Sequence, residues 1–326
     1  MLHPMQADAS FRRYIRIRKG THSMILMDAP PEKENIEPYI AIARYLHGKG
    51  YSAPEILAQD VKAGLLLIED LGDDSFTQVL KRASGREHEL YTAAVDVLAE
   101  WHDEARRFFD PQALPLPLYD EALLMREACL FADWYLPQVM GKDKARELRG
   151  EYIALWQDIL GKAPLASKSW VHRDYHADNL MWLPARSGTQ RVGLLDFQDG
   201  VYGDAAYDVV SLLEDARRDV APILAKAMID RYLAASGADR ERFLTAYAIL
   251  GAQRNCKIIG IFSRLAARDN KHAYLNYLPR VWRYLEHDLA HPALADLRRW
   301  IDSHITADQR GVIALRHTSQ ELALTA

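Results

Sequence analysis

The stretch WVHRDYHADNLMW, residues 170–182, places polar side chains that could do chemistry within an apolar run. It contains His172, Asp174 and Asn179, and a further carboxylate, Asp196, follows 17 residues after the asparagine in the apolar run VGLLDFQDG. Polar groups this dense beside apolar residues are costly to bury unless they are solvated, paired or functional. These four side chains are therefore the first candidates for a functional site.

The types and spacing of these side chains suit phosphoryl transfer. In that chemistry one carboxylate accepts the proton of a hydroxyl group, and oxygen ligands hold Mg²⁺ on the phosphates of a nucleotide. Asp174 and Asn179, five positions apart in a loop, can point to the same side, and Asp196 at a strand end completes a set of hard oxygen ligands. The same order of Asp, Asn and then Asp before Phe occurs in kinase motifs.

A purely structural explanation is a capped loop followed by a strand-end aspartate that is bonded to backbone N–H groups. The pattern H-x-D-x-x-x-x-N arises by chance in roughly one protein of this length in fifty. The aspartate after two leucines, and a matching small lobe upstream, make coincidence rarer still. The sequence therefore favours a functional site.

The elements that must position this site fall into two groups. Residues 12–29 alternate between apolar and polar, break at Lys19-Gly20 and resume, which predicts a β-hairpin. Apolar residues with helical spacing follow, and two more strands flank a turn at 60–63. Residues 10–71 therefore predict a small, mostly antiparallel sheet with one helix.

The remainder of the chain is mainly helical in its pattern. Amphipathic helices are predicted at 75–109, 119–160, 204–235 and 240–268, with short strands at 168–172 and 191–197. We predict an α+β fold with a small β-rich lobe, residues 1–71, and a larger helical lobe, residues 72–326. The polar cluster lies in the larger lobe, in a loop after a strand, where binding and catalytic groups concentrate.

Composition limits the classes of protein to consider. The chain has 326 residues, of which 49% are apolar and 26% charged, as in an ordinary soluble globular protein. The net charge of −4 argues against a nucleic-acid-binding protein. No run of 18 apolar residues predicts a membrane span, and the N-terminus lacks the pattern of a signal peptide. Cys129 and Cys256 lack metal-ligand spacing and suit two buried thiols, so we expect a cytoplasmic protein.

Two long motifs carry a family resemblance. WVHRDYHADNLMW and LLDFQDGVYGDAAYDVVSLLED resemble the catalytic half of the aminoglycoside phosphotransferase/choline kinase superfamily, which is related to protein kinases. The G-D-x-x-Y-D run and the histidine after Asp174 are typical of the small-molecule kinases, and no A-P-E segment follows. DASFRRY, ILMDAPPEKE and QRNCKIIGIFSRL further resemble the anomeric kinases that phosphorylate N-acetylmuramate and N-acetylglucosamine at C1 in bacterial cell-wall recycling.

The resemblance implies a bilobal, kinase-like fold, ATP as co-substrate, Mg²⁺ as metal, and a role for each matching residue. Asp174 would be the catalytic base, and Asn179 and Asp196 would hold Mg²⁺. His172 and Asp208 would brace the catalytic loop, with His176 behind it.

The resemblance also implies a nucleotide site in the small lobe. Glu69 to Leu71 would be the hinge whose backbone meets adenine. Ser10, Arg12 and Arg13 occupy the place of the loop that covers the phosphates; the structural alternative is a turn entering a strand, with the arginines on a solvated face.

The third predicted strand, SMILMDAP, departs from the kinase pattern because it lacks the lysine that pairs with the α- and β-phosphates. Arg12, Arg13 or Lys33 could supply this cation, and Glu34 or Glu37, expected on the following helix, could orient it. The departure leaves a nucleotide-binding pseudokinase as an alternative from another functional class.

The substrate is suggested by a local excess of basic residues. Residues 241–285 contain eight Lys/Arg and two acids, and Arg254, Lys257, Arg264 and Arg268 fall within an arc of roughly 80° on one helix. The arc could be a solvated helix flank, or part of it could bind a carboxylate.

A cationic aminoglycoside or an amino alcohol would need acidic groups in its pocket. We therefore expect an ATP-dependent kinase for a neutral or anionic sugar such as N-acetylmuramate, whose lactyl carboxylate would meet Arg254, Lys257 or Arg264. An aminoglycoside or choline-like phosphotransferase is the alternative within the same class. No membrane or nucleic-acid partner is expected, and the pattern leaves the oligomeric state open.

Overall fold

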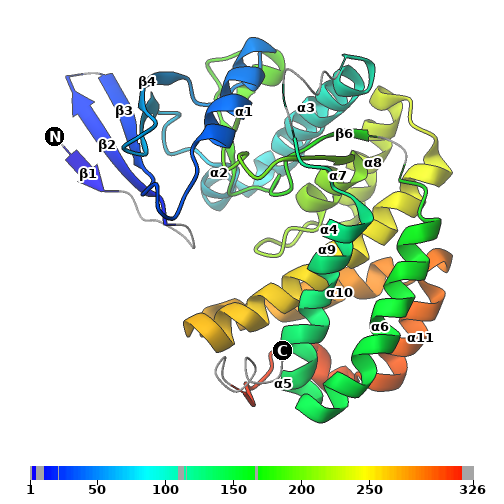
Figure 1. Cartoon of the computed structure of the whole chain (residues 1–326). Coiled ribbons are helices and arrows are strands. Elements are labelled where there is room, and N and C mark those ends of the chain that lie inside the picture. The colour runs from blue at the N-terminus through cyan, green and yellow to red at the C-terminus, as the bar shows by residue number, and fades with distance from the viewer. Residues whose placement is uncertain are drawn as a thin grey trace. The chain divides into compact units, whose positions relative to one another are not determined.

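The computed structural model describes residues 2–4, 11–20, 22–108, 114, 116–165 and 168–317 (Figure 1). Contacts between residues divide the chain into two units, each discontinuous in sequence. Unit 1 comprises residues 1–117, 172–201 and 227–236, and unit 2 comprises residues 118–171, 202–226 and 237–326. The predicted lobes, 1–71 and 72–326, rest on the change from a strand pattern to a helical pattern after Leu71. Their assignment to nucleotide binding and to catalysis with substrate binding stays a prediction.

Unit 1 contains a five-stranded antiparallel sheet with strand order β1-β2-β3-β5-β4. Its strands are β1 (Leu2–Pro4), β2 (Arg13–Lys19), β3 (His22–Asp28), β4 (Ile56–Asp60) and β5 (Leu65–Glu69). The predicted hairpin is confirmed, since β2 and β3 pair without a break from Arg13 opposite Asp28 to Lys19 opposite His22. β1 was not predicted because three residues are too few to show an alternating pattern.

Helices complete unit 1. They are α1 (Glu37–Gly48), α2 (Phe76–Arg82), α3 (Glu87–Phe108) and most of α8 (Pro222–Ser236). The predicted helical spacing is confirmed in α1, where Ile40, Ala43 and Leu46 are buried together. An ion pair between Arg231 and Asp96, with Nε–Oδ1 at 2.6 Å, joins α8 to α3 although 135 residues separate them.

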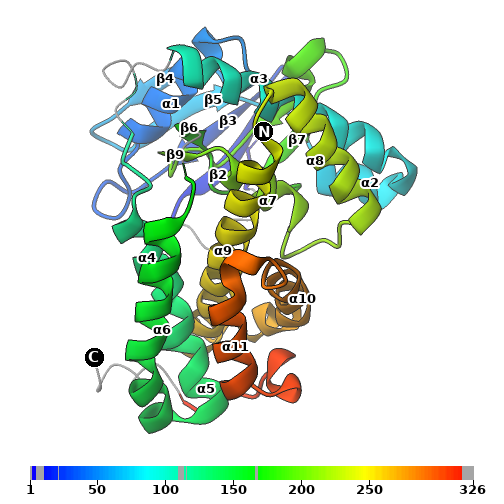
Figure 2. The same ribbon diagram turned by 90° about the vertical axis from the view of Figure 1, so that its right-hand side faces the viewer.

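Unit 2 is mainly helical (Figure 2). Its longer elements are α4 (Glu121–Leu130), the π-helical segment η2 (Phe131–Tyr135), α5 (Leu136–Met140), α6 (Lys142–Lys162), α7 (Ala206–Leu213), α9 (Arg240–Asp269), α10 (Leu278–Asp288) and α11 (Ala295–His304). Helix α9 is the central element, with α4, η2, α7 and α10 packed against it. Its Gly260 lets the backbones approach closely, because a Cβ there would lie 2.3 Å from the carbonyl carbon of Leu130.

Three of the four predicted long helices are interrupted. The range predicted as one helix, 119–160, is interrupted by η2 and again at Gly141, which has a φ of 85°. The helix predicted at 75–109 breaks near Gly85, and that predicted at 204–235 breaks before Pro222. Glycine or proline residues are present at these places, but the predicted helices were continued across them. The helix predicted at 240–268 is confirmed as α9.

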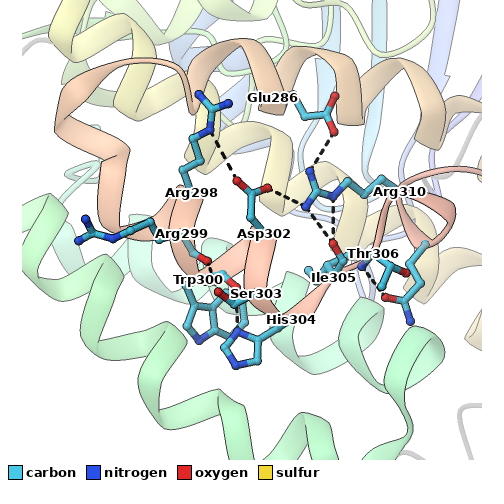
Figure 3. Close-up of polar contacts among 11 residues, drawn as sticks. Glu286, Arg298, Arg299, Trp300, Asp302, Ser303, His304, Ile305, Thr306 and Arg310 are labelled. Atoms are coloured by element: carbon cyan, nitrogen blue, oxygen red, sulfur yellow. Dashed lines mark hydrogen bonds and ion pairs between the residues drawn. The ribbon is translucent and has the colours of Figure 1, made fainter.

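Arg310 contacts two helices in the C-terminal part of unit 2 (Figure 3). Arg310 Nη1 lies 3.2 Å from Glu286 Oε1, and Nη2 lies 2.8 Å from Asp302 Oδ1. The guanidinium also donates to the carbonyl of Ile305 and lies 5.7 Å from the ring centre of Trp282. One side chain therefore ties the chain after α11 to both α10 and α11.

The α+β class is confirmed by the sheet of unit 1 and the helices of unit 2. Cys129 and Cys256 are both free and buried, as predicted. Among the residues that the structure describes, no helix is long and apolar enough to cross a membrane.

Candidate active site

A two-stranded ribbon in unit 1 brings the predicted metal ligands to one end. β7 (Leu180–Trp182) and β8 (Val192–Leu194) are antiparallel, with Leu180 opposite Leu194. The residues just outside this pair, Asn179 and Leu195, therefore face each other, and the N–H of Leu195 donates to the carbonyl of Asn179 at 3.0 Å. Asp196 follows directly, so the ribbon itself places Asn179 and Asp196 at the same end.

The loop before β7 is folded by its own hydrogen bonds. The carbonyl of Asp174 accepts from the backbone N–H of His176 at 3.0 Å and from the Nδ2 of Asn179 at 3.0 Å. Because the amide nitrogen of Asn179 is engaged within the loop, its amide oxygen is the atom that can ligate a cation. The predicted base and one predicted metal ligand are thus held in one turn.

Buried aromatic residues anchor this loop. The hydroxyl of Tyr175 donates to the carbonyl of Ala94 in α3 at 2.9 Å, and its ring lies edge-on to Trp101. His172 is fully buried against Tyr175, with ring centres 5.7 Å apart. Burial lowers the pKa of His172 to about 4, so the imidazole is neutral near pH 7. A neutral, immobile histidine suits the predicted bracing role.

Two residues of the constellation have left-handed backbone conformations. Arg173 has a φ of 73° and Asp196 a φ of 60°. Such values are uncommon outside glycine, and they concentrate at functional sites where the surrounding structure holds them. The Nη1 of Arg173 donates to the carbonyl of Asp199 at 3.3 Å, which fixes one such turn.

Asp196 is accessible and surrounded by polar groups. Its side chain is 50% exposed, and its carboxylate accepts from Gln198 Nε2 at 2.9 Å. Partial desolvation of the carboxylate, with the charges of Asp174 and Asp199, raises the pKa of Asp196, while Gln198 and Arg12 oppose the shift. No role for Gln198 was predicted; the signal that could have indicated one is its position two residues after Asp196, in LDFQDG.

The predicted nucleotide loop is partly described. Ser10 lies outside the described residues. Arg12 is buried and its Nη2 lies 3.1 Å from Glu34 Oε2, whereas Arg13 is exposed and pairs with Asp28 at 2.6 Å. Glu34 precedes α1 and is not on the helix as expected; the first helical residue is Glu37.

The predicted hinge, Glu69 to Leu71, begins at the last residue of β5. Next to it, Asp70 Oδ1 accepts a hydrogen bond from Arg16 Nη2 at 2.9 Å. Burial raises the pKa of Asp70, but hydrogen bonds from Ser23, the N–H of Gly72 and Arg16 outweigh burial and leave the pKa low. The Leu71 side chain lies against Gly193 of β8, where a Cβ would be 2.9 Å from its Cδ1. The hinge is thus fixed to the sheet and to the ribbon within unit 1.

The other predicted site residues lie in unit 2. Asp208 is fully buried on α7. Arg254 is buried on α9 and donates to Ser211 Oγ at 3.0 Å and to the carbonyl of Glu214 at 3.3 Å.

Lys257 and Arg264, further along α9, differ in their surroundings. Lys257 Nζ lies 2.8 Å from Glu127 Oε1. Arg264 is half-buried, and within the described part of the chain its Nε has no hydrogen-bond partner. Burial, and Arg268 beside it, lower the pKa of Arg264.

The residues at the end of the ribbon fit a nucleotide-borne Mg²⁺. No group of three or more His, Cys, Asp or Glu side chains with metal-site geometry occurs among the described residues. A magnesium ion carried by nucleotide phosphates needs only one or two protein ligands, because phosphates and water supply the rest. An accessible carboxylate beside an amide oxygen meets that requirement.

Comparisons with known proteins show which proteins the chain resembles. The chain is 38% identical to an N-acetylmuramate/N-acetylglucosamine kinase of Caulobacter vibrioides, over 93% of this chain and 92% of the relative. It is 40% identical to one of Pseudomonas aeruginosa, over 91% of this chain and 86% of the relative.

A crystal structure of a putative aminoglycoside phosphotransferase from Ralstonia eutropha has the same kinase-like fold. Its TM-score is 0.60 at 16% identity, over 92% of this chain and 93% of that chain. Residues 2–244 match the model of the phosphotransferase enzyme family. The predicted superfamily is confirmed: the chain belongs to the phosphotransferase enzyme family.

Proposed function

We propose that this phosphotransferase uses ATP to phosphorylate the anomeric C1 hydroxyl of N-acetylmuramate and N-acetylglucosamine. The observation that supports the chemistry is the joint placement of Asp174, Asn179 and Asp196 by one loop and one ribbon. The choice of sugar is supported by relatives at 38% and 40% identity that bear the name of this kinase. A cytoplasmic location is part of the proposal.

In the proposed reaction Asp174 is the general base. The C1 hydroxyl oxygen forms a bond to the γ-phosphorus, the bond from that phosphorus to the β-bridging oxygen breaks, and ADP leaves. The hydroxyl proton passes to the Asp174 carboxylate. Asn179 and Asp196 would hold Mg²⁺, which would supply positive charge to neutralise the phosphates. His172, neutral and buried, and Asp208 keep their proposed bracing roles.

The adenine is proposed to meet the backbone at Glu69 to Leu71. That segment suits the role because Asp70 and Leu71 fix it on both sides, so its backbone groups are positioned before the nucleotide arrives. Ser10 and Arg13, from the predicted phosphate loop, remain proposed nucleotide contacts beside Arg12.

For the lactyl carboxylate we propose the basic residues of α9, with Arg264 as the foremost. Arg254 already donates to two internal acceptors, and Lys257 pairs with Glu127. Arg264 makes no ion pair within the described residues, and burial is the main cause of its lowered pKa, with Arg268 adding to it and Asp269 opposing it. An anion beside Arg264 would therefore stabilise its charge.

The test is ATP consumption against a panel of N-acetylmuramate, N-acetylglucosamine, other amino sugars, choline and kanamycin, with ³¹P NMR of the product. A sugar 1-phosphate, recognised by the coupling of its phosphorus to the anomeric proton, is expected for the first two compounds. Phosphorylation of kanamycin or choline in their place, or of no acceptor at all, contradicts the proposal.

A further inference from the structure

Strand β3 cannot supply the cation that kinases place there for the nucleotide phosphates. It consists of HSMILMD and contains no lysine or arginine. Met27 is fully buried, and the Asp28 carboxylate pairs with Arg13 at 2.6 Å. A site that binds a polyphosphate still needs a positive charge near the α- and β-phosphates. That charge must come from another element.

Arg12, just before β2, lies where such a charge is needed. Its Nη2 is 3.1 Å from Glu34 Oε2, and its Nη1 is 3.7 Å from Asp196 Oδ1. The guanidinium therefore lies between an acid of the loop before α1 and the proposed metal ligand. Asp196 is proposed to hold the metal that the phosphates carry, so a group that reaches Asp196 would also be within reach of the phosphates.

The environment of Arg12 distinguishes it from its neighbours. Its side chain is 9% exposed, against 69% for Arg13. A buried guanidinium is costly unless it is paired, and Glu34, itself only 16% exposed, supplies the partner. The contact with Asp196 is longer, and that carboxylate is half exposed. The Glu34 contact is thus suited to be permanent and the Asp196 contact to be exchanged.

We propose that Arg12, oriented by Glu34, binds the phosphates of the nucleotide in place of the missing β3 lysine. When the nucleotide binds, the Nη1 side of Arg12 would exchange the Asp196 carboxylate for phosphate oxygens, which would leave Asp196 to hold the metal. The planar fork of arginine allows this exchange while Nη2 stays on Glu34. Glu34 is a positioning residue. The inference rests on the proposed function in that the site must bind a nucleotide.

The test compares ADP with adenosine, which lacks the phosphates, by calorimetric titration in the presence of Mg²⁺. Arg12→Ala should weaken ADP binding about 10- to 100-fold, the usual cost of a lost hydrogen bond to a charged group. Adenosine binding should change less than twofold. Arg44→Ala is the matched control, since Arg44 is an exposed arginine of unit 1 bonded to Gln59. It should leave both affinities unchanged.

A merely structural ion pair between Arg12 and Glu34 predicts a different result. Both affinities would then fall by the same factor, together with the melting temperature. Arg12→Gln is the second variant in case Arg12→Ala fails to fold, because glutamine keeps length and a donor. A ratio of ADP to adenosine affinity equal to that of the wild type, in either folded variant, overturns the proposal.

The positioning role of Glu34 is tested by comparing how its substitution changes KM for ATP and kcat. Glu34→Gln keeps the size of the side chain but not its charge, so it should raise KM for ATP about tenfold while kcat falls less. Glu34→Asp should recover part of the loss. An unchanged KM in Glu34→Gln shows that Glu34 does not orient Arg12.

The two proposals can fail separately. Absence of phosphate transfer by the wild type to any acceptor contradicts the proposed function, while the ADP and adenosine titrations still measure the role of Arg12. Normal transfer by the wild type with an unchanged affinity ratio in Arg12→Ala contradicts only the inference about Arg12.

Discussion

At the scale of single residues, Asp174 carries the proposed chemistry. Asp174→Asn keeps the shape of the side chain. It also keeps the backbone carbonyl of residue 174, which accepts hydrogen bonds from Asn179 and His176. It removes the proton acceptor, so kcat should fall about 10²- to 10⁴-fold. Unfolding temperature and ATP affinity should stay near wild type. Turnover within threefold of the wild type would show that Asp174 is not the base.

Asp196 should act through the metal. Asp196→Asn is the suitable change because asparagine tolerates the left-handed conformation, φ 60°, that alanine would strain. A neutral amide is a poorer Mg²⁺ ligand than a carboxylate, so the affinity for Mg·ATP should fall at least tenfold. Binding of ATP without Mg²⁺ is the control and should change little. Intact Mg·ATP affinity with a large loss of stability would make Asp196 structural.

The sequence predicted part of this site and not the rest, for a physical reason. Asp174, Asn179 and Asp196 share a short segment, and local strand pairing brings them together. Arg12 was expected near the phosphates from the family resemblance, but its contact with Asp196, across 184 positions of sequence, was not predicted. A contact at that separation depends on how the whole sheet is assembled, which no local pattern records.

At the scale of elements, the π-helical segment η2, which packs closely against Gly260, could not be predicted from the sequence pattern. A Cβ at Gly260 would lie 2.3 Å from the Leu130 carbonyl carbon and 2.6 Å from the backbone nitrogen of Phe131, where the π-helical segment begins. The apolar pattern continues through this segment, so periodicity alone predicted one unbroken helix. Short strands such as β7, buried on both faces, were likewise read as loop.

Gly260→Ala should therefore destabilise the protein. Backbone atoms cannot move aside as a flexible side chain can, so α9 must separate from α4 and η2, at a cost of about 1–3 kcal/mol or more. Gly150→Ala on α6 is the matched control, because nothing lies within 4 Å of its Cβ position. It should stabilise by about 0.5–1 kcal/mol. Denaturant unfolding of both variants is the measurement, and equal effects would contradict the packing argument.

Two acids, Glu214 and Asp288, are buried together in unit 2. Asn255 Nδ2 donates to Glu214 Oε2 at 2.7 Å and to Asp288 Oδ2 at 3.0 Å. Burial raises the pKa of Glu214 to about 7, against hydrogen bonds from Asn255 and Tyr247 and the charge of Arg254. Burial and Glu214 also raise the pKa of Asp288 well above its usual range.

Acids whose pKa is higher in the folded state bind more protons folded than unfolded. Stability from this pair is therefore full below about pH 4 and is lost as pH rises towards and past 7. Asp288→Asn removes one of the two titrations. Its unfolding free energy relative to wild type should therefore rise with pH between 5 and 8, by at most about 1.4 kcal/mol per unit. Asp143→Asn, whose side chain is 99% exposed, should show no such trend.

At the scale of the whole molecule, charge is distributed unevenly. The net charge is −4, yet residues 241–285 contain eight basic residues and two acids. Part of this excess is neutralised internally, since Asp219 bonds both Arg280 and Arg283, and Lys257 pairs with Glu127. The sequence could count these charges but could not show which are engaged. The count of basic residues in this segment therefore overstates the positive surface available to a substrate.

N-acetylmuramate and N-acetylglucosamine differ by one charged group, the lactyl carboxylate. If Arg264 binds the lactyl carboxylate, Arg264→Ala should lower kcat/KM for N-acetylmuramate about 10- to 100-fold more than for N-acetylglucosamine. Lys257→Ala should show a smaller selective loss, because Glu127 already engages its charge. Arg254→Ala should cost stability without selectivity, because its donors serve Ser211 and Glu214. Equal slowing of both sugars in all three variants would mean that α9 is scaffold and the carboxylate is recognised elsewhere.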